Sequence, residues 1–174
     1  MKERKIVALI DEYKPDELPE RYRDLVEVAK AATLHAYAPY SRFHVGAAIR
    51  LENGKIVSGA NQENAAFSSG TCAERSACFY ASSEYPGVPF RQIAIAAYAE
   101  HDQAATSHDQ PADSDPAAIR FQADPISPCG ACRQALLEYE NLYKGDVEVI
   151  LFGRDRVYVL PSIKSLLPLC FTEF

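Results

Sequence analysis

A change in the spacing of apolar residues, from helical to strand-like, places the strongest limit on the fold. Residues 16–37 carry apolar side chains at three- and four-residue spacing, with Asp16 positioned to cap a helix and Pro19 acceptable in its first turn. Alternate residues are then apolar from Phe43 to Leu51, and Asn53-Gly54 precedes a second apolar run at 55–60. This pattern predicts an amphipathic helix followed by an antiparallel pair of strands.

The same reading extends along the chain. It predicts helices at 72–85 and 130–140 and strands at 93–99, 147–152 and 157–160. Helices that alternate with strands predict an α/β fold: a three-layer α/β/α sandwich with a mixed sheet of about five strands. The 174 residues fit a single domain, 1–174.

Two segments lie outside this pattern, an N-terminal extension at 1–15 and an acidic inserted loop at 99–124. The loop holds six acidic residues against one arginine, so it carries most of the formal net charge of −6. A loop of this length inside a compact domain is usually functional or disordered. We expect it to lie near the mouth of the site or at a subunit interface.

Composition narrows the class of protein further. No basic surface is expected from the net charge, and no apolar run approaches the roughly 20 residues that span a bilayer. Five cysteines, two of them in a C-x-x-C, follow no secretion signal. We therefore expect a cytoplasmic protein with reduced thiols that are free to bind a metal.

Three cysteines stand at predicted helix starts: Cys72 in T-C-A-E-R, and Cys129 and Cys132 in P-C-G-A-C-R. The positive end of a helix dipole favours the thiolate, and sulfur ligands favour zinc. Three protein ligands leave the fourth tetrahedral position open, which is typical of a catalytic site. The alternatives are a zinc site that only stabilises the fold, or thiols that are simply buried.

Charged residues next to these cysteines favour catalysis. Glu74 follows Cys72 by two residues, where its carboxylate can move protons without binding the metal. Arg75 and Arg133 each follow a motif residue, and their guanidinium groups could offset the charge of three thiolates. We interpret Cys78 and Cys170 as core residues, and the four histidines, His35, His44, His101 and His108, as structural or surface residues.

The motifs Cys72-Ala73-Glu74 and Pro128-Cys129-Gly130-Ala131-Cys132 match the zinc-deaminase pattern. From 39 to 171 the sequence resembles the cytidine deaminases of the small, homotetrameric, three-cysteine type. Cysteine as the first ligand points away from the deoxycytidylate, tRNA-adenosine and polynucleotide branches. The resemblance implies one Zn²⁺ per subunit, held by the three motif cysteines.

The resemblance also implies the residues that bind a nucleoside. Phe43 would pack beside it, and Asn61 and Glu63 would hydrogen-bond the ribose 3′-hydroxyl. The pyrimidine would receive a hydrogen bond from the backbone N–H of Ala73 at O2 and donate one from its amino group to the carbonyl of Ser127. Phe171 would stack on the base in the site of a neighbouring subunit. Phe67 stands where many relatives have tyrosine.

The implied reaction is hydrolytic deamination of cytidine and deoxycytidine to uridine and deoxyuridine. Zinc hydroxide would attack C4 of the pyrimidine, and Glu74 would take the water proton, deliver it to N3 and then serve the departing amine. Two other readings stay open: a deaminase of another aminopyrimidine, such as a blasticidin-like nucleoside, and a zinc-stabilised binding protein without activity. We expect a small-molecule nucleoside as partner, a homotetramer with shared sites, and neither nucleic acid nor membrane.

Overall fold

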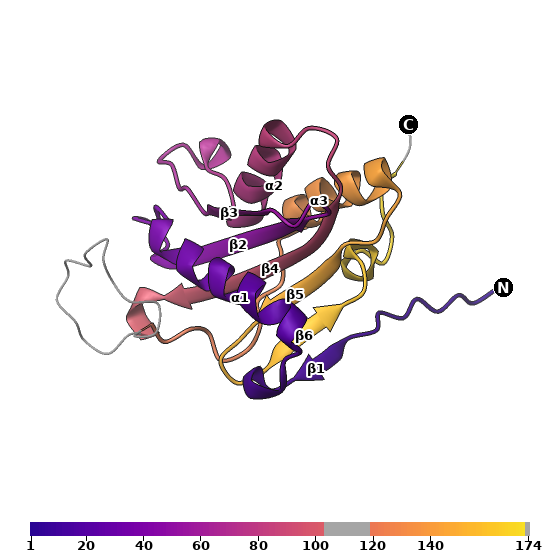
Figure 1. Ribbon diagram of the computed structural model, residues 1–174, viewed down its shortest axis with the longest axis horizontal. Helices are drawn as coiled ribbons and strands as arrows, with labels where there is room; N and C mark the ends of the chain where they lie inside the picture. Colours follow the sequence, from indigo (N-terminus) through magenta and orange to yellow (C-terminus); the bar gives the residue numbers. More distant parts are fainter. Residues whose placement is uncertain (103–118, 173–174) are drawn as a thin grey trace.

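The computed structural model covers residues 1–174 and describes 1–102 and 119–172. Six strands form one sheet in the order β1-β6-β5-β4-β2-β3 (Figure 1). Their bounds are β1 (Asp11–Tyr13), β2 (Phe43–Leu51), β3 (Ile56–Ala60), β4 (Phe90–Ala99), β5 (Glu148–Phe152) and β6 (Val157–Leu160). Strands β4 and β5 run parallel, and the other neighbours are antiparallel. The sheet is therefore mixed, as predicted.

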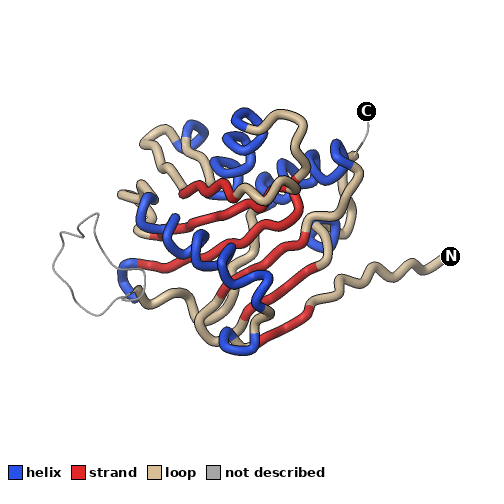
Figure 2. The backbone as a smooth tube through the Cα atoms, in the orientation of Figure 1, coloured by secondary structure: helices blue, strands red, loops and turns tan. Residues whose placement is uncertain are grey.

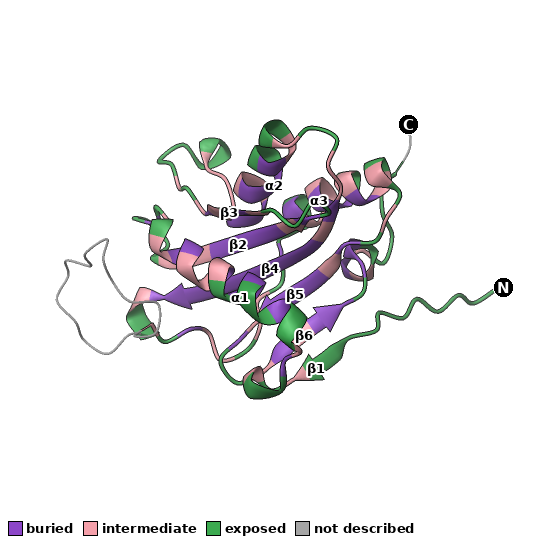
Figure 3. Ribbon diagram, in the orientation of Figure 1, coloured by how far each residue is buried: buried purple, intermediate pink, exposed green. Residues whose placement is uncertain are grey.

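Helices cover both faces of this sheet, so the predicted three-layer sandwich is confirmed (Figure 2). Helix α1 (Glu20–Ala32) packs on one face, and α2 (Ala73–Glu84) and α3 (Gly130–Tyr143) pack on the other. Alternation along β2 divides the side chains between the two layers. Ile49 packs under α2 and α3, whereas its neighbour Ala48 packs under α1, and both are fully buried. Most of β2 is coloured as buried in Figure 3.

The sheet has one strand more than the five or so expected. The added strand is β1, which lies within the predicted N-terminal extension and pairs antiparallel with β6, Glu12 opposite Tyr158. Its three residues are too few to show a period of two in the sequence. The prediction missed it because its strand conformation comes from pairing with β6 rather than from its own pattern.

The start of the first helix also differs from the prediction. Asp16 lies in a short 3₁₀ turn, Pro15–Glu17, and α1 begins at Glu20 after Pro19. The residue before a proline is biased away from helical backbone, and Leu18 has ψ 128°. The helix therefore cannot run through this point, and Asp16 is not its cap.

A glycine on β3 lets α2 lie directly on the sheet. A Cβ atom at Gly59 would lie 2.5 Å from the backbone nitrogen of Ala77 and 3.0 Å from the carbonyl oxygen of Ala73. Only glycine allows this approach of helix and strand backbones. The contact holds the first turns of α2 close to the end of β3, where the predicted nucleoside-binding segment begins.

The described ends of the acidic insertion are attached to the body. β4 ends at Ala99, and the Glu100 carboxylate is 2.9 Å from Nε2 of His44 on β2. On the other side, buried Phe121 makes edge contacts with Tyr98 and Phe152. The rest of the predicted loop, 103–118 with His108, lies outside the described residues. Within the described part of the chain, no helix is long and apolar enough to cross a membrane.

Candidate active site

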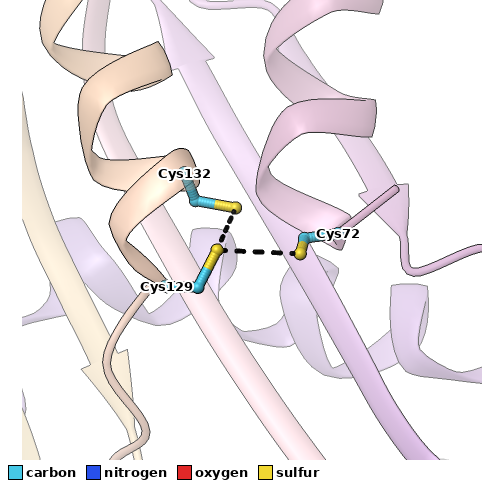
Figure 4. A group of neighbouring side chains, drawn as sticks. All are labelled: Cys72, Cys129 and Cys132. Carbon is cyan, nitrogen blue, oxygen red and sulfur yellow. Dashed lines mark hydrogen bonds between the residues drawn. The ribbon is translucent and has the colours of Figure 1, made fainter. Parts of the chain in front are cut away.

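Two helix starts bring the three predicted cysteines together (Figure 4). Cys72 is the N-cap of α2, Cys129 is the N-cap of α3, and Cys132 lies in the first turn of α3. The Sγ atom of Cys129 is 3.9 Å from that of Cys72 and 3.4 Å from that of Cys132, and all three lie within 4.8 Å of one another. Residues 57 positions apart along the chain thus form one cluster.

The donor set fits a zinc ion. Sulfur ligands about 2.3 Å from a tetrahedral zinc ion lie about 3.8 Å apart, and the observed distances bracket this value. The sequence suggested that backbone N–H groups at the helix starts would stabilise the thiolates. Neither Cys72 nor Cys129 accepts such a capping hydrogen bond from its own helix. Three sulfurs placed in this way can supply three of the four ligands of a tetrahedral metal site.

The pKa values of two of the clustered thiols shift in opposite directions. A hydrogen bond from Cys132, with help from Arg75 and Cys129, lowers the pKa of the Cys72 thiol to about 5 despite its partial burial. The same hydrogen bond to Cys72, together with burial and the charge of Glu74, raises the pKa of Cys132. These opposite shifts favour the thiolate at Cys72 and the thiol at Cys132, so Cys132 would release its proton on binding a metal.

Glu74 and Arg75 follow Cys72 in the first turn of α2. Glu74 is only 4% exposed, and burial, with a smaller contribution from the Cys72 charge, raises the pKa of its carboxyl. Nη2 of Arg75 lies 3.9 Å from the Cys72 sulfur. A carboxyl whose pKa is raised holds a proton more readily, and this property suits a general acid/base beside the cluster.

Arg133 does not contact the sulfurs as Arg75 does. Its guanidinium donates to the carbonyl oxygens of Pro128 at 2.7 Å and Leu166 at 2.8 Å, and to the Ser127 hydroxyl at 2.8 Å. These bonds join the loop before Cys129 to the C-terminal segment. In this structure Arg133 fixes the position of two backbone segments. The predicted effect of its charge on the sulfurs is not supported by a direct contact with them.

The predicted nucleoside-binding residues form a second group. The Asn61 side chain accepts a hydrogen bond from the Val45 N–H at 2.8 Å and donates to the Phe43 carbonyl at 2.9 Å. Asn61 therefore joins the end of β3 to the start of β2. This arrangement holds Phe43 and Asn61 side by side and leaves the Phe43 ring half-buried.

Glu63 is anchored in the same segment. Its carboxylate accepts hydrogen bonds from the backbone N–H groups of Tyr40 at 2.9 Å and Ser41 at 3.2 Å. Although burial opposes it, hydrogen bonding from Ser41 and Tyr40 lowers the pKa of Glu63, so its carboxylate is charged. Both backbone hydrogen bonds go to Oε2, and the Ser41 side chain also supports the carboxylate.

A short backbone bridge joins this group to the cysteines. Gln62 and Thr71 exchange two hydrogen bonds, each 2.9 Å long. Thr71 directly precedes Cys72, so the segment 61–63 runs beside the start of α2. The two predicted groups, separated by about ten residues of chain, are thus parts of one site.

The other predicted residues lie around the start of α3 and of α2. Ala73, the first residue of α2, is fully buried beneath the cluster. Ser127 is exposed two residues before Cys129. Phe171 is 60% exposed, and its carbonyl accepts a hydrogen bond from the Gln134 side chain at 2.9 Å. An exposed aromatic ring held at a fixed point suits contact with another subunit.

Two polar residues of α3 were not identified from the sequence. Gln134 secures the tail that carries Phe171. Glu140, 1% exposed, accepts hydrogen bonds from the N–H groups of Val147 and Ile163 and from the Ser162 hydroxyl. A signal for Glu140 was present, because it occupies the apolar stripe of α3 four residues after Leu136.

Comparison with known proteins agrees with this geometry. Residues 19–144 match the family model described as the cytidine and deoxycytidylate deaminase zinc-binding region. The cytidine deaminase of Sporosarcina psychrophila is 36% identical over 150 residues, which cover 86% of this chain and 90% of that protein. A probable cytidine deaminase of Dictyostelium discoideum is 33% identical, covering 88% of this chain and 86% of that one.

Solved structures give the same result. The crystal structure of cytidine deaminase from Burkholderia pseudomallei aligns with a TM-score of 0.65 and 38% identity, covering 86% of this chain and 98% of that chain. The cytidine deaminase of Mycobacterium tuberculosis aligns with a TM-score of 0.61 and 26% identity, covering 87% and 98%. With its cysteine cluster and buried Glu74, the chain belongs to the cytidine deaminase family of hydrolases.

Proposed function

We propose that this chain catalyses the zinc-dependent hydrolytic deamination of cytidine and deoxycytidine to uridine and deoxyuridine, with release of ammonia. The observation that carries the proposal is a buried glutamate with a raised pKa beside three clustered cysteine sulfurs. A protein that used zinc only for stability would not need such a proton carrier. When bound by the three sulfurs, zinc supplies a water molecule acidic enough to react at neutral pH.

The chain's own residues have distinct parts in this proposal. Glu74 would take a first proton from the attacking water and deliver it to N3 of the pyrimidine; it would then take the proton of the new C4 hydroxyl and pass it to the departing amine. The backbone N–H of Ala73 holds O2, and the Ser127 carbonyl accepts from the amino group. Asn61 and Glu63 grip the ribose hydroxyl; the β2 backbone holds Asn61, and the backbone N–H groups of Tyr40 and Ser41 hold Glu63. Phe43 packs beside the nucleoside.

Arg75 has an electrostatic role in this proposal. Three thiolates around one zinc ion carry a net negative charge, which would make a coordinated water less acidic. A guanidinium 3.9 Å from the Cys72 sulfur withdraws part of this charge. We propose this charge-tuning role for Arg75, and for Arg133 a role in holding the Cys129 loop.

The proposed assembly is a homotetramer in which the Phe171 ring of one subunit reaches the site of a neighbour. The exposure of that ring supports the idea. We also propose a cytoplasmic location, because all five cysteines are unpaired and three of them must stay reduced to bind metal.

Ammonia release by zinc-loaded protein tests the function. We expect turnover of cytidine and deoxycytidine, and a Glu74→Gln variant should lower kcat by at least about 100-fold while zinc content stays the same. Glu84→Gln, an exposed glutamate at the end of the same helix, is the matched control and should retain full activity. Zinc content is measured by atomic emission.

A substrate panel separates the remaining alternatives. If a blasticidin-like nucleoside or a base-modified cytidine is turned over much faster than cytidine, the chain acts on another aminopyrimidine. If the wild-type protein binds zinc and releases no ammonia from any of them, the zinc-stabilised binding protein is the better reading.

A further inference from the structure

The first residues of the chain form an exposed apolar arm. Residues 6–10 read Ile-Val-Ala-Leu-Ile, and every residue from 1 to 10 is exposed. The large apolar side chains of residues 6–10 are exposed by 74% at Val7, 70% at Leu9, 60% at Ile6 and 49% at Ile10. The arm continues from the start of β1 and leads away from the sheet (Figure 1). Adjacent exposed apolar side chains of this kind mark a surface that is covered in use.

The arm is continuous with an open edge of the sheet. β1 is the terminal strand, paired with β6 on one side only among the described strands. An open edge presents unpaired N–H and C=O groups that can bond to another strand. β-branched residues such as Ile6, Val7 and Ile10 favour an extended backbone, so the arm suits this kind of pairing.

The chemistry of the arm is self-complementary about Ala8. Residues 4–12 read Arg-Lys-Ile-Val-Ala-Leu-Ile-Asp-Glu, with two bases at one end and two acids at the other. An antiparallel pair of arms centred on Ala8 places Ile6 opposite Ile10 and Val7 opposite Leu9. It also places Lys5 opposite Asp11, and Arg4 opposite Glu12. Directly opposed side chains lie on the same face of a sheet, so each of these pairs can make contact.

We propose that residues 4–12 pair with the same residues of a second copy of this chain, as an antiparallel ribbon with a two-fold axis at Ala8. The interface is isologous, since each contact occurs twice. The two sheets then join through their extended N-terminal strands, with Asp11 and Glu12 of each β1 opposite Lys5 and Arg4 of the other copy, and the exposed apolar residues 6–10 are covered. A second copy is the partner that this sequence favours, because its acidic residues 11 and 12 lie opposite the basic residues 5 and 4 of the first copy.

The ion pair between Glu12 and Arg156 is compatible with this arrangement. Their nearest atoms are 3.7 Å apart, and both side chains are about half exposed, so Glu12 can also face Arg4 of the second copy. The proposal does not depend on the deaminase activity, because no residue of the arm lies in the candidate active site.

Charge exchange within the full-length protein tests the register. Variant A carries Arg4→Glu and Lys5→Asp, and variant B carries Asp11→Lys and Glu12→Arg. Each variant alone places like charges opposite each other, whereas an A–B pair and the fourfold variant restore every opposite-charge pair. Association is followed by sedimentation velocity over a concentration series at low salt. We expect the Kd of the arm-dependent step to rise at least about tenfold in A and in B.

The mixture of A with B, and the fourfold variant, should regain wild-type association. An unchanged Kd in both A and B would overturn the proposal, and so would failure of the mixture to recover. Because Glu12→Arg could disturb β1, a second variant is tested. Ala8→Pro removes a backbone N–H donor from the exposed arm and changes no residue of β1. It should abolish the same step and leave the melting temperature of the body unchanged.

Hydrogen exchange distinguishes pairing between two copies from folding of the arm onto its own chain. The amides of residues 6–10 should be protected increasingly as protein concentration rises, and Ala8→Pro should remove this protection. Protection that is independent of concentration would mean that the arm folds onto its own chain, and would contradict pairing between copies. Absence of protection at every concentration would contradict it equally.

Discussion

At the scale of single residues, two arginines with equivalent places in the sequence have different surroundings. Arg75 and Arg133 each follow a motif residue, and the sequence suggested one charge-tuning role for both. Arg75 does face a ligand sulfur, whereas Arg133 donates to two carbonyl oxygens and a hydroxyl. One of these acceptors, Leu166, is 33 residues further along the chain. Motif spacing cannot reveal such a partner, because it is set by tertiary packing.

This difference predicts different responses to lysine. Arg75→Lys keeps a positive charge beside the sulfur, so kcat should fall less than in Arg75→Ala. Arg133→Lys loses the fork geometry that reaches three acceptors, and should be as damaging as Arg133→Ala, with zinc affinity reduced by about tenfold or more. Zinc affinity from chelator competition and steady-state kcat measure the two effects. If zinc affinity and kcat fall only slightly in Arg133→Lys but strongly in Arg133→Ala, the positive charge of Arg133 is what matters, and this prediction is wrong.

At the scale of elements, the strongly periodic segments were predicted and the short or packing-dependent ones were not. The Asn53-Gly54 turn and the alternation before it predicted the β2–β3 pair, and Gly54 has the positive φ of 81° that such a turn needs. β1 was missed because three residues carry no period. The cysteine cluster was predicted from motif chemistry, but its connection to Asn61 through the Gln62–Thr71 bridge is a tertiary contact without a sequence signal.

The connection from α3 to the end of the sheet depends on one buried carboxylate. Glu140 accepts bonds from Val147 at 3.0 Å, Ser162 at 2.7 Å and Ile163 at 2.8 Å, so it fixes the start of β5 and the turn after β6. Glu140→Gln replaces one acceptor oxygen with a donor facing donors. We expect the free energy of unfolding to fall by about 2–3 kcal/mol. Urea denaturation measures it, and the exposed Glu138→Gln on the same helix should change stability by less than about 0.5 kcal/mol.

At the scale of the whole molecule, the net negative charge and the exposed aromatic residues lie in different parts of the sequence. The segment 99–124 carries most of the net charge, which leaves the remaining sequence close to neutral. Exposed aromatic residues lie outside that segment: Phe67 is 91% exposed, and Phe79, Tyr80 and Phe171 are each at least half exposed. Surfaces of this kind are typical of chains that associate. Resemblance predicted an oligomer, and the sequence pattern alone did not.

Sharing of sites between subunits predicts complementation. Glu74→Gln lacks the proton carrier, and Phe171→Ala lacks the ring that a neighbour would receive. When the two variants are co-expressed with different tags and purified as mixed oligomers, a Phe171→Ala subunit can accept the ring of a Glu74→Gln subunit. Random mixing should therefore give about one quarter of wild-type kcat/KM for cytidine, well above either variant alone. If Phe171 instead serves its own chain, no site in the mixture holds both groups. Activity would then not exceed the mean of the two separate variants.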